Sequence, residues 1–188
     1  GTSGAGAILT RATLEVHVRP TQSATALVVP TSDAAVLQLL QALERELGDY
    51  LSAFEGLSGH AMQAAIDHVP DLRNPFAPEP APDFALLIEL EAASSKAYTG
   101  LDLQEALNHF LQDQFEQTID NAVIGNGPAL WHLRHSISEG ASALGKPIAF
   151  DVSVPRSQIM AFCRAARAVV AQDFPFLHVV DFGHIADG

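Results

Sequence analysis

Residues 131–155, WHLRHSISEGASALGKPIAFDVSVP, contain most of the signals from which the fold and the function of this chain can be inferred. Apolar residues recur at helical spacing in the first half, and a glycine and an alternating apolar run follow. The pattern predicts an amphipathic helix, a turn, and a strand that stops at a Val-Pro pair. Because residues three and four apart on a helix are neighbours, one helix face should carry Trp131, Arg134, His135 and Ser138.

Arg134 and Ser138 are candidate ligands for an anionic oxygen acid. A guanidinium group grips a carboxylate through two parallel hydrogen bonds, and a hydroxyl group one helical turn later can add another. A surface arginine beside an amphipathic helix would have the same spacing, so the pattern allows both interpretations. His184 is a further candidate, because it lies at the end of the last predicted strand, where loops often carry functional groups. A lone histidine at such a place can equally be structural.

The rest of the chain alternates between strand and helix patterns. Strand signals fall at residues 14–18, 24–29, 50–55, 84–90, 119–124, 148–153 and 177–182. Helical spacing predicts helices at residues 33–47, 58–68, 102–115, 130–144 and 155–174. A group of prolines in residues 70–82 predicts a long exposed loop. By pattern alone, strands alternating with helices favour a parallel α/β sheet.

Composition and charge narrow the class of protein. With 48% apolar and 17% charged residues, the 188-residue chain has the composition of one well-packed domain. Its net charge of −12 repels phosphate backbones, so nucleic acid is not an expected partner. No apolar run approaches the roughly 18 residues that a membrane span needs, so the chain is not expected to be transmembrane.

Cys163 is the single cysteine of the chain. An internal disulfide is therefore excluded, and we expect a reducing compartment, the cytoplasm. Because Cys163 falls on the apolar side of the helix predicted at residues 155–174, we expect its thiol to be buried in the core and unreactive. The chain starts with glycine in a loop-like stretch and ends within a motif, which indicates a fragment of a longer protein.

Four segments resemble, in order, the C-terminal half of FAD-linked oxidases of the vanillyl-alcohol oxidase type. The resemblance is closest to bacterial FAD-dependent D-2-hydroxyacid dehydrogenases, which act on D-lactate, glycolate or D-2-hydroxyglutarate. The segments are GTSGAGAILTRATLEVHVRP (1–20), YLSAFEGLSGHAM (50–62), LRHSISEG (133–140) with FDVSVPRSQI (150–159), and FGHIADG (182–188).

The resemblance implies a fold that differs from the one suggested by the pattern alone. It implies an α+β domain of ferredoxin-like units, in which helices cover one face of a largely antiparallel sheet. Residues 1–20 would be a remnant of the FAD-binding domain, and residues 21–188 a substrate-binding (cap) domain truncated at its C-terminus. In the remnant, Gly1, Gly4 and Ile8 would lie near the flavin, where glycines let the backbone approach closely.

The resemblance also implies a reaction, the transfer of a hydride from the substrate Cα to the flavin. Arg134 would clamp the carboxylate of the hydroxy acid, and Ser138 would donate a hydrogen bond to it. His184 would be a ligand of a divalent metal such as zinc, or a catalytic proton acceptor. Family members often carry lysine at the position of Ala149, and its absence weakens the case for a doubly anionic substrate such as 2-hydroxyglutarate.

A competing interpretation is a non-catalytic ligand-binding or oligomerisation module on a ferredoxin-like fold, because a fold does not determine a function. On the enzyme interpretation, the partners are a small 2-hydroxy acid and the protein's own flavin domain. Apolar surface that normally packs on that domain would also favour self-association into a homodimer. The 188-residue chain by itself is expected to be inactive, colourless and without tightly bound zinc.

Overall fold

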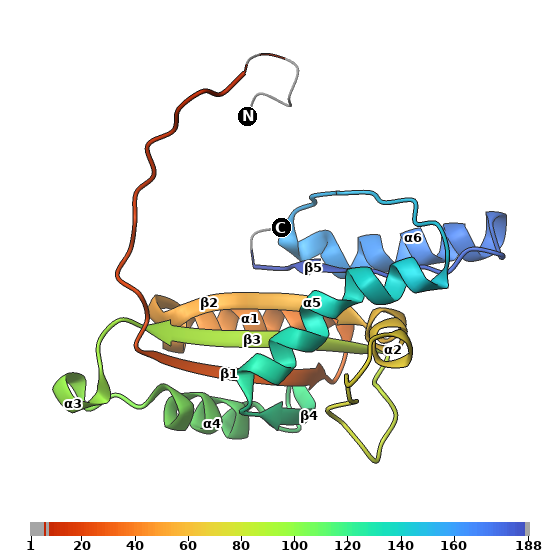
Figure 1. Ribbon diagram of the computed structural model, residues 1–188. Helices are drawn as coiled ribbons and strands as arrows, with labels where there is room; N and C mark the ends of the chain where they lie inside the picture. The colour runs from red at the N-terminus through yellow and green to blue at the C-terminus, as the bar shows by residue number, and fades with distance from the viewer. Residues whose placement is uncertain (1–5, 7, 187–188) are drawn as a thin grey trace.

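The computed structural model describes residue 6 and residues 8–186, and its centre is a five-stranded antiparallel sheet (Figure 1). The order of strands across the sheet is β4-β1-β3-β2-β5. The strands are β1 (Gln22–Pro30), β2 (Leu51–Ser58), β3 (Phe84–Ala92), β4 (Ile119–Ile124) and β5 (Phe182–His184). All four pairings are antiparallel, which confirms the α+β class and excludes the parallel sheet that the pattern alone favoured.

Six α-helices and two short 3₁₀ turns accompany the sheet in the described part of the chain. The helices are α1 (Asp33–Leu47), α2 (Gly59–His68), α3 (Lys96–Thr99), α4 (Leu103–Gln114), α5 (Gly127–Leu144) and α6 (Ile159–Asp173). The 3₁₀ turns are η1 (Gly48–Tyr50) and η2 (Arg156–Gln158). Among the described residues, no helix combines the length and the apolar character that a membrane span requires.

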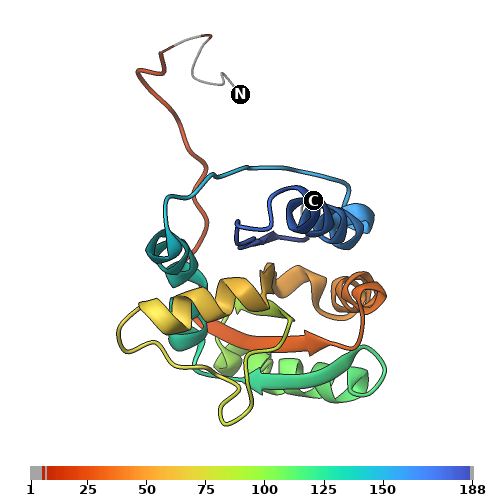
Figure 2. The same ribbon diagram turned by 90° about the vertical axis from the view of Figure 1, so that its right-hand side faces the viewer.

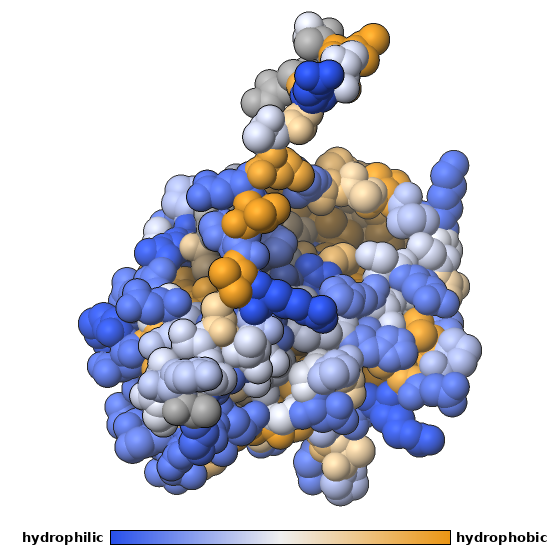
Figure 3. All heavy atoms as spheres, turned by 60° about the vertical axis from the view of Figure 1, so that its left-hand side comes forward, coloured by the Kyte–Doolittle hydropathy of each residue, from blue (hydrophilic) through white to orange (hydrophobic). Residues whose placement is uncertain are grey.

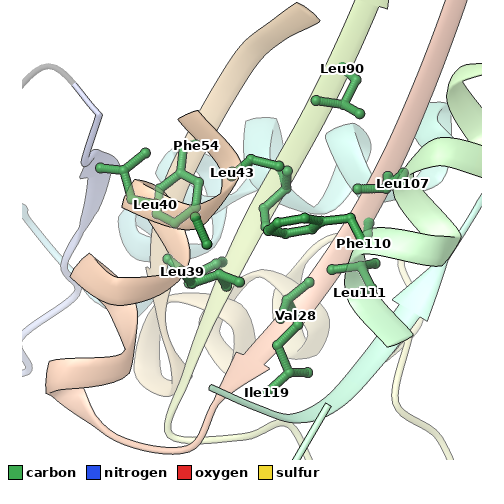
Figure 4. Packing of buried hydrophobic residues seen from close by; sticks show 14 of the residues in the cluster. Val28, Leu39, Leu40, Leu43, Phe54, Leu90, Leu107, Phe110, Leu111 and Ile119 are labelled. Atoms are coloured by element: carbon green, nitrogen blue, oxygen red, sulfur yellow. The ribbon is translucent and has the colours of Figure 1, made fainter. Parts of the chain in front are cut away.

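The helices pack on both faces of the sheet, so the expectation that they cover one face is wrong. The central strands are apolar on both sides: Leu86 and Ile88 of β3 point to one core, and Leu87 points to the other. α1 and α4 cover the first core, which Figure 4 shows in close-up. α2 and α5 lie together over the second core, on the opposite side of the sheet from α4 (Figure 2). A strand buried on both faces needs two layers of helices to exclude water.

Side-chain caps begin three of the helices close to where the sequence predicts. The Ser32 hydroxyl accepts a hydrogen bond from the Ala35 N–H, and the Ser58 hydroxyl accepts one from the Ala61 N–H, each at 3.2 Å. The carboxylate of Asp102 accepts from two backbone N–H groups in the first turn of α4. Each cap satisfies donors that the helix cannot pair internally, so a capping residue indicates the start of a helix reliably.

α5 and α2 approach each other at Gly140. A Cβ atom at this position would lie 2.5 Å from the carbonyl carbon and oxygen of Ala64 and 2.5 Å from the Ala65 nitrogen. Glycine is therefore required here by the close contact between two helix backbones. The contact fixes the height of α5 above the sheet, and hence the position of every side chain that α5 directs at β2 and β3.

Two predicted strands, at residues 14–18 and 148–153, are absent from the structure. The apolar side chains that produced the alternating pattern are exposed instead, as for Val16 and for Phe150, which is 84% exposed. Hydrophobic side chains stand along the N-terminal segment where it rises from the body of the molecule (Figure 3). An alternating sequence forms a strand only where a neighbouring strand supplies hydrogen bonds, and neither segment has one among the described residues. The last strand is also shifted, from 177–182 to β5.

Ion pairs attach α6 to the rest of the domain. None of its residues is buried, although its sequence has an apolar side. The pairs join Arg156 of η2 to Glu44, Arg164 to Asp33, and Arg167 to Asp181. Ile159 and Met160 of α6 also pack against the first core, but α6 contributes no buried residue to either core, unlike the other long helices.

Cys163 lies on α6 and is half-buried, so its expected place in the core is wrong. Partial burial raises the pKa of the Cys163 thiol, and the charge of Asp181 raises it further, against the opposing effect of Arg167. Since the thiolate is the reactive species, we expect native Cys163 to react with a disulfide reagent at pH 8 more slowly than the unfolded chain does.

The labelling experiment needs no background correction, because the chain has no other thiol. The rate is measured in buffer and again in denaturant, at the same pH and reagent concentration. A native rate equal to or above the denatured rate would contradict the expected protection of the thiol.

Candidate active site

Glu55 lies at the centre of a cluster of charged side chains contributed by three distant segments. It is on β2, on the face of the sheet that α2 and α5 cover, and its side chain is 4% exposed. Its Oε2 accepts a hydrogen bond from Arg134 Nε on α5 at 2.5 Å. Its Oε1 lies 3.1 Å from Nδ1 of His184 on β5. The structure thus brings together Arg134 and His184, two of the residues selected from the sequence, on opposite oxygens of one carboxylate.

The pairing of β2 with β5 explains why His184 reaches Glu55. In the antiparallel register Glu55 is opposite His184, Gly56 is opposite Gly183, and Leu57 is opposite Phe182. Side chains of directly opposite residues project from the same face of a sheet. Because β5 is the outermost strand, His184 remains at the rim with a side chain that is 71% exposed.

The guanidinium group of Arg134 is held by a second contact besides Glu55. Its central carbon lies 4.6 Å from the centre of the Phe182 ring, in the arrangement of a cation–π interaction. The side chain is 15% exposed, so the group lies at the edge of the protein interior. The hydrogen bond to Glu55 uses Nε, and no described residue bonds the Nη1–Nη2 edge of the guanidinium, which remains a fork for another carboxylate.

Ser138 follows Arg134 by one turn on the same face of α5, as its spacing predicts. The residue is exposed, and its carbonyl oxygen accepts a hydrogen bond of 2.8 Å from the Ser142 hydroxyl. Among the described residues its own hydroxyl group makes no hydrogen bond that would hold it in place. Ser138 is thus within one helical turn of the charged cluster and has a hydroxyl group that is free to bind a ligand.

A second carboxylate, Glu89 of β3, anchors the beginning of α5. The Trp131 Nε1–H donates to Glu89 Oε1 at 2.8 Å, and the Thr25 hydroxyl donates to the same oxygen at 3.1 Å. The ring of His135 stacks on Trp131, with 5.3 Å between the ring centres. Trp131 and His135 therefore hold the beginning of α5 in place, whereas the Arg134 side chain contacts Glu55.

Comparison with known families matches residues 19–188 to the family described as FAD linked oxidases, C-terminal domain. The chain belongs to this family. The match confirms the resemblance seen in the sequence motifs, and it covers nearly the whole chain of this FAD-linked oxidase C-terminal domain.

Relatives of this FAD-linked oxidase domain carry names that refer to one reaction. D-2-hydroxyglutarate dehydrogenase of Stutzerimonas stutzeri (strain A1501) is 31% identical over 201 residues, covering 100% of this chain and 39% of the relative. The mitochondrial D-2-hydroxyglutarate dehydrogenase of Arabidopsis thaliana is 24% identical over 193 residues, covering 100% and 33%. A probable mitochondrial D-2-hydroxyglutarate dehydrogenase of Oryza sativa subsp. indica is 28% identical over 154 residues, covering 80% and 26%. The domain thus spans between a quarter and two fifths of the length of these relatives.

The two best-defined cavities in the described part of this FAD-linked oxidase domain are too small to hold FAD. One of them has a volume of about 240 Å³ and lies between residues 19–23 and Glu91, away from Glu55. Pockets for ligands of drug size are usually larger, about 300–1,000 Å³. Of the three residues predicted near the flavin, Ile8 is 90% exposed on the N-terminal segment, and Gly1 and Gly4 lie outside the described residues.

A zinc site does not fit the described residues either. Residue 6 and residues 8–186 contain no group of three or more His, Cys, Asp or Glu side chains that could hold a metal ion. His184 has one carboxylate beside it, Glu55, and the other oxygen of that carboxylate is already bonded to Arg134. Zinc sites in proteins use three or four ligands. The role of His184 as a metal ligand stays a prediction.

Sequence reasoning selected Arg134 and His184 but missed Glu55. The signal was present in YLSAFEGLSGHAM, where Glu55 alternates with Ala53 and Leu57 and so occupies an inward position of the strand. A charged residue at an inward position indicates a buried partner, because an unpaired carboxylate is costly to bury.

Proposed function

We propose that this chain is the substrate-binding part of an FAD-dependent enzyme that oxidises a D-2-hydroxy acid to the 2-keto acid. The observation that carries the proposal is the set of contacts that hold the Arg134 side chain. Glu55 and Phe182 hold its guanidinium group, His184 contacts the other oxygen of the same Glu55 carboxylate, and the Nη1–Nη2 edge makes no hydrogen bond to a described residue. A fixed fork loses little entropy when it binds a carboxylate, so it orients an acid well.

Each candidate residue has a separate task in this proposal. Arg134 binds the substrate carboxylate through Nη1 and Nη2, and Ser138 donates a hydrogen bond to the same group. His184 accepts the proton of the 2-hydroxyl group at Nε2 as the C–H electron pair leaves Cα. FAD, when it is bound in the intact enzyme, supplies the acceptor for that hydride. The step would leave the keto acid in the site and the proton on the imidazole, with the hydride taken up by the flavin.

Two observations bear on the substrate and point in different directions. The names of the relatives favour D-2-hydroxyglutarate, which carries two carboxylates. Ala149, where family members often have lysine, offers no cation for the second carboxylate, and it lies in an exposed segment without helix or strand. On the grounds of charge we take monocarboxylates such as D-lactate and glycolate as the first candidates, and D-2-hydroxyglutarate as the second.

The substrate is tested with the intact FAD enzyme that contains this chain and an artificial electron acceptor. We expect turnover of D-lactate or glycolate with a higher kcat/KM than for D-2-hydroxyglutarate. Ala149→Lys should raise kcat/KM for D-2-hydroxyglutarate at least about tenfold, because one charge-assisted hydrogen bond contributes about 1.5–3 kcal/mol. The same variant should change kcat/KM for the monocarboxylates by less than about twofold, so these substrates are the matched control. Absence of turnover with every D-2-hydroxy acid would favour the non-catalytic module instead.

The remaining parts of the proposal concern partners and location. Exposed apolar side chains, among them Ile148, Phe150 and Phe176, provide a surface on which a flavin domain or a second copy could pack. A cytoplasmic location is proposed from the single cysteine, although several relatives are named as mitochondrial.

A further inference from the structure

We propose that Glu55 is a positioning residue that makes Arg134 bind a carboxylate end-on, through its Nη1–Nη2 edge. A guanidinium group has two kinds of edge that fit a carboxylate: a side edge, which includes Nε, and the end edge, which uses both Nη atoms. Glu55 occupies Nε of Arg134 and therefore closes the side edge to a ligand. The effect on substrate binding rests on the proposed function, whereas the position of the guanidinium group does not.

Glu55 can hold Arg134 because its own position is fixed. Its strand, β2, lies between β3 and β5, and Glu55 is opposite Leu87 in one pairing and His184 in the other. Its side chain is 4% exposed, so little water competes for Oε2. A buried carboxylate needs a charged partner, and Arg134 Nε provides it at 2.5 Å. The long arginine side chain thus ends at a rigid acceptor.

Two further contacts limit the freedom that remains to Arg134. Its guanidinium carbon lies over the Phe182 ring, 4.6 Å from the ring centre. The helix that carries it is held at its beginning by the hydrogen bond from Trp131 to Glu89. A side chain that is ordered before the ligand arrives loses less entropy on binding. The end edge of Arg134 is therefore presented in one orientation.

Two substitutions of Glu55 separate its hydrogen-bond acceptor from its charge. Glu55→Gln removes the charge but keeps an oxygen that can accept from Arg134 Nε. Glu55→Met removes both and keeps an unbranched side chain of similar length. A positioning role predicts that glutamine preserves substrate binding and that methionine does not. A purely electrostatic role predicts a lower KM in both variants, because a negative charge near the bound anion is removed.

Glu89 provides a matched control for the loss of charge. It is a partly buried carboxylate on the same face of the sheet, also beneath α5. Its partners are Trp131 and the hydroxyl groups of Thr25 and Ser52, so it has no contact with Arg134 through a hydrogen bond. Glu89→Gln removes one charge from the same layer of the domain and should leave Arg134 as it is in the wild type.

The position of Arg134 is measured without substrate, by ¹⁵N NMR of the arginine Nε–H groups in the labelled chain at neutral pH. Among the arginines of the described residues, Arg134 and Arg167 donate through Nε, each to a carboxylate. Both Nε–H groups should therefore exchange slowly with water. Arg134→Lys identifies the Arg134 signal by its loss, and Arg167 is the internal reference.

We expect the Arg134 Nε–H to stay protected in Glu55→Gln and in Glu89→Gln, and to exchange rapidly in Glu55→Met. An unprotected Arg134 Nε–H in the wild type would overturn the proposal, and this measurement requires no substitution of Glu55. Protection that persists in folded Glu55→Met would overturn it as well.

Substrate binding is measured on the intact FAD enzyme, first with D-lactate. Glu55→Met should raise KM about tenfold, because Arg134 then has to be ordered by the substrate itself. The value of kcat should change less than about threefold, because Arg134 holds the carboxylate equally before and during hydride transfer. In Glu55→Gln and in Glu89→Gln, KM should stay within about threefold of the wild type.

A KM of Glu55→Gln outside this range, in either direction, would overturn the positioning role, as would a wild-type KM in Glu55→Met. Loss of stability alone would shift the unfolding midpoint and would not raise KM selectively in the folded enzyme. If the intact enzyme oxidises no D-2-hydroxy acid, the proposed function fails, while the NMR result still decides whether Glu55 holds Arg134.

Discussion

Arg134→Ala in the intact enzyme should lower kcat/KM for the hydroxy acid about a hundredfold. The loss corresponds to about 2–3 kcal/mol, the contribution of a bidentate hydrogen bond between charged groups. The structure supports this magnitude, because Glu55 and Phe182 already hold the guanidinium group and little ordering is left for the substrate to induce. Most of the effect should appear in KM, measured by steady-state kinetics over a range of substrate concentrations.

The alanine variant has a second effect that must be separated from the first. It leaves Glu55 as a buried carboxylate without its cation, which commonly destabilises a protein by about 3–5 kcal/mol. Arg134→Lys is the matched control, because lysine keeps a cation beside Glu55 but has no planar fork. We expect the lysine variant to unfold near the wild-type denaturant concentration and still to lose at least about tenfold in kcat/KM. Wild-type kcat/KM in either variant would contradict the role of Arg134 as the carboxylate clamp.

Gly140→Ala should lower the free energy of unfolding by about 1–3 kcal/mol, the usual cost of overpacking. In a helix, alanine is intrinsically more stable than glycine by about 0.5–1 kcal/mol, so a loss has to come from packing. The added Cβ would lie 2.5 Å from three backbone atoms of Ala64 and Ala65, and backbone atoms cannot rotate out of the way. α5 and α2 must then separate, which can be measured by urea denaturation.

Gly48→Ala is the control for this substitution. Gly48 closes α1 with φ of −58°, and the nearest atom to an added Cβ is the Glu44 Cβ at 4.0 Å. The new residue fits this conformation without strain, so it should be neutral or stabilising by up to about 1 kcal/mol, because it restricts the unfolded chain. Equal midpoints for Gly140→Ala and the wild type would show that the two helices are not in close contact in solution.

Local rules predicted much of this fold. The caps at Ser32, Ser58 and Asp102 placed three helix starts within one residue of their positions in the structure. These signals act over a few residues and depend on no distant partner. Local rules did not predict the antiparallel direction of the strands, because short connections permit either direction. The family resemblance predicted that direction.

The errors share a physical cause, which is that the sequence does not show what lies next to a segment. Residues 14–18 and 148–153 have the alternation of strands, but the structure gives them no neighbouring strand. Cys163 lies on an apolar helix side that the rest of the domain covers only in part. Glu55 was missed for the same reason: its importance comes from Arg134 and His184, and the register of β2 with β5 decides that meeting.

The order of strands in the sheet also has a consequence for how this protein reaches its native state. Only β2 and β3 are both adjacent in the sheet and consecutive among the strands; the other three pairings close long loops. Such non-local topologies fold slowly, because chain entropy is lost before the contacts that compensate for it are made. Arg134, Glu55 and His184 meet only after β5, a strand of three residues, has docked on β2. The candidate site is therefore among the last parts to assemble, and fraying of this one edge strand would dismantle it while the two cores remain folded.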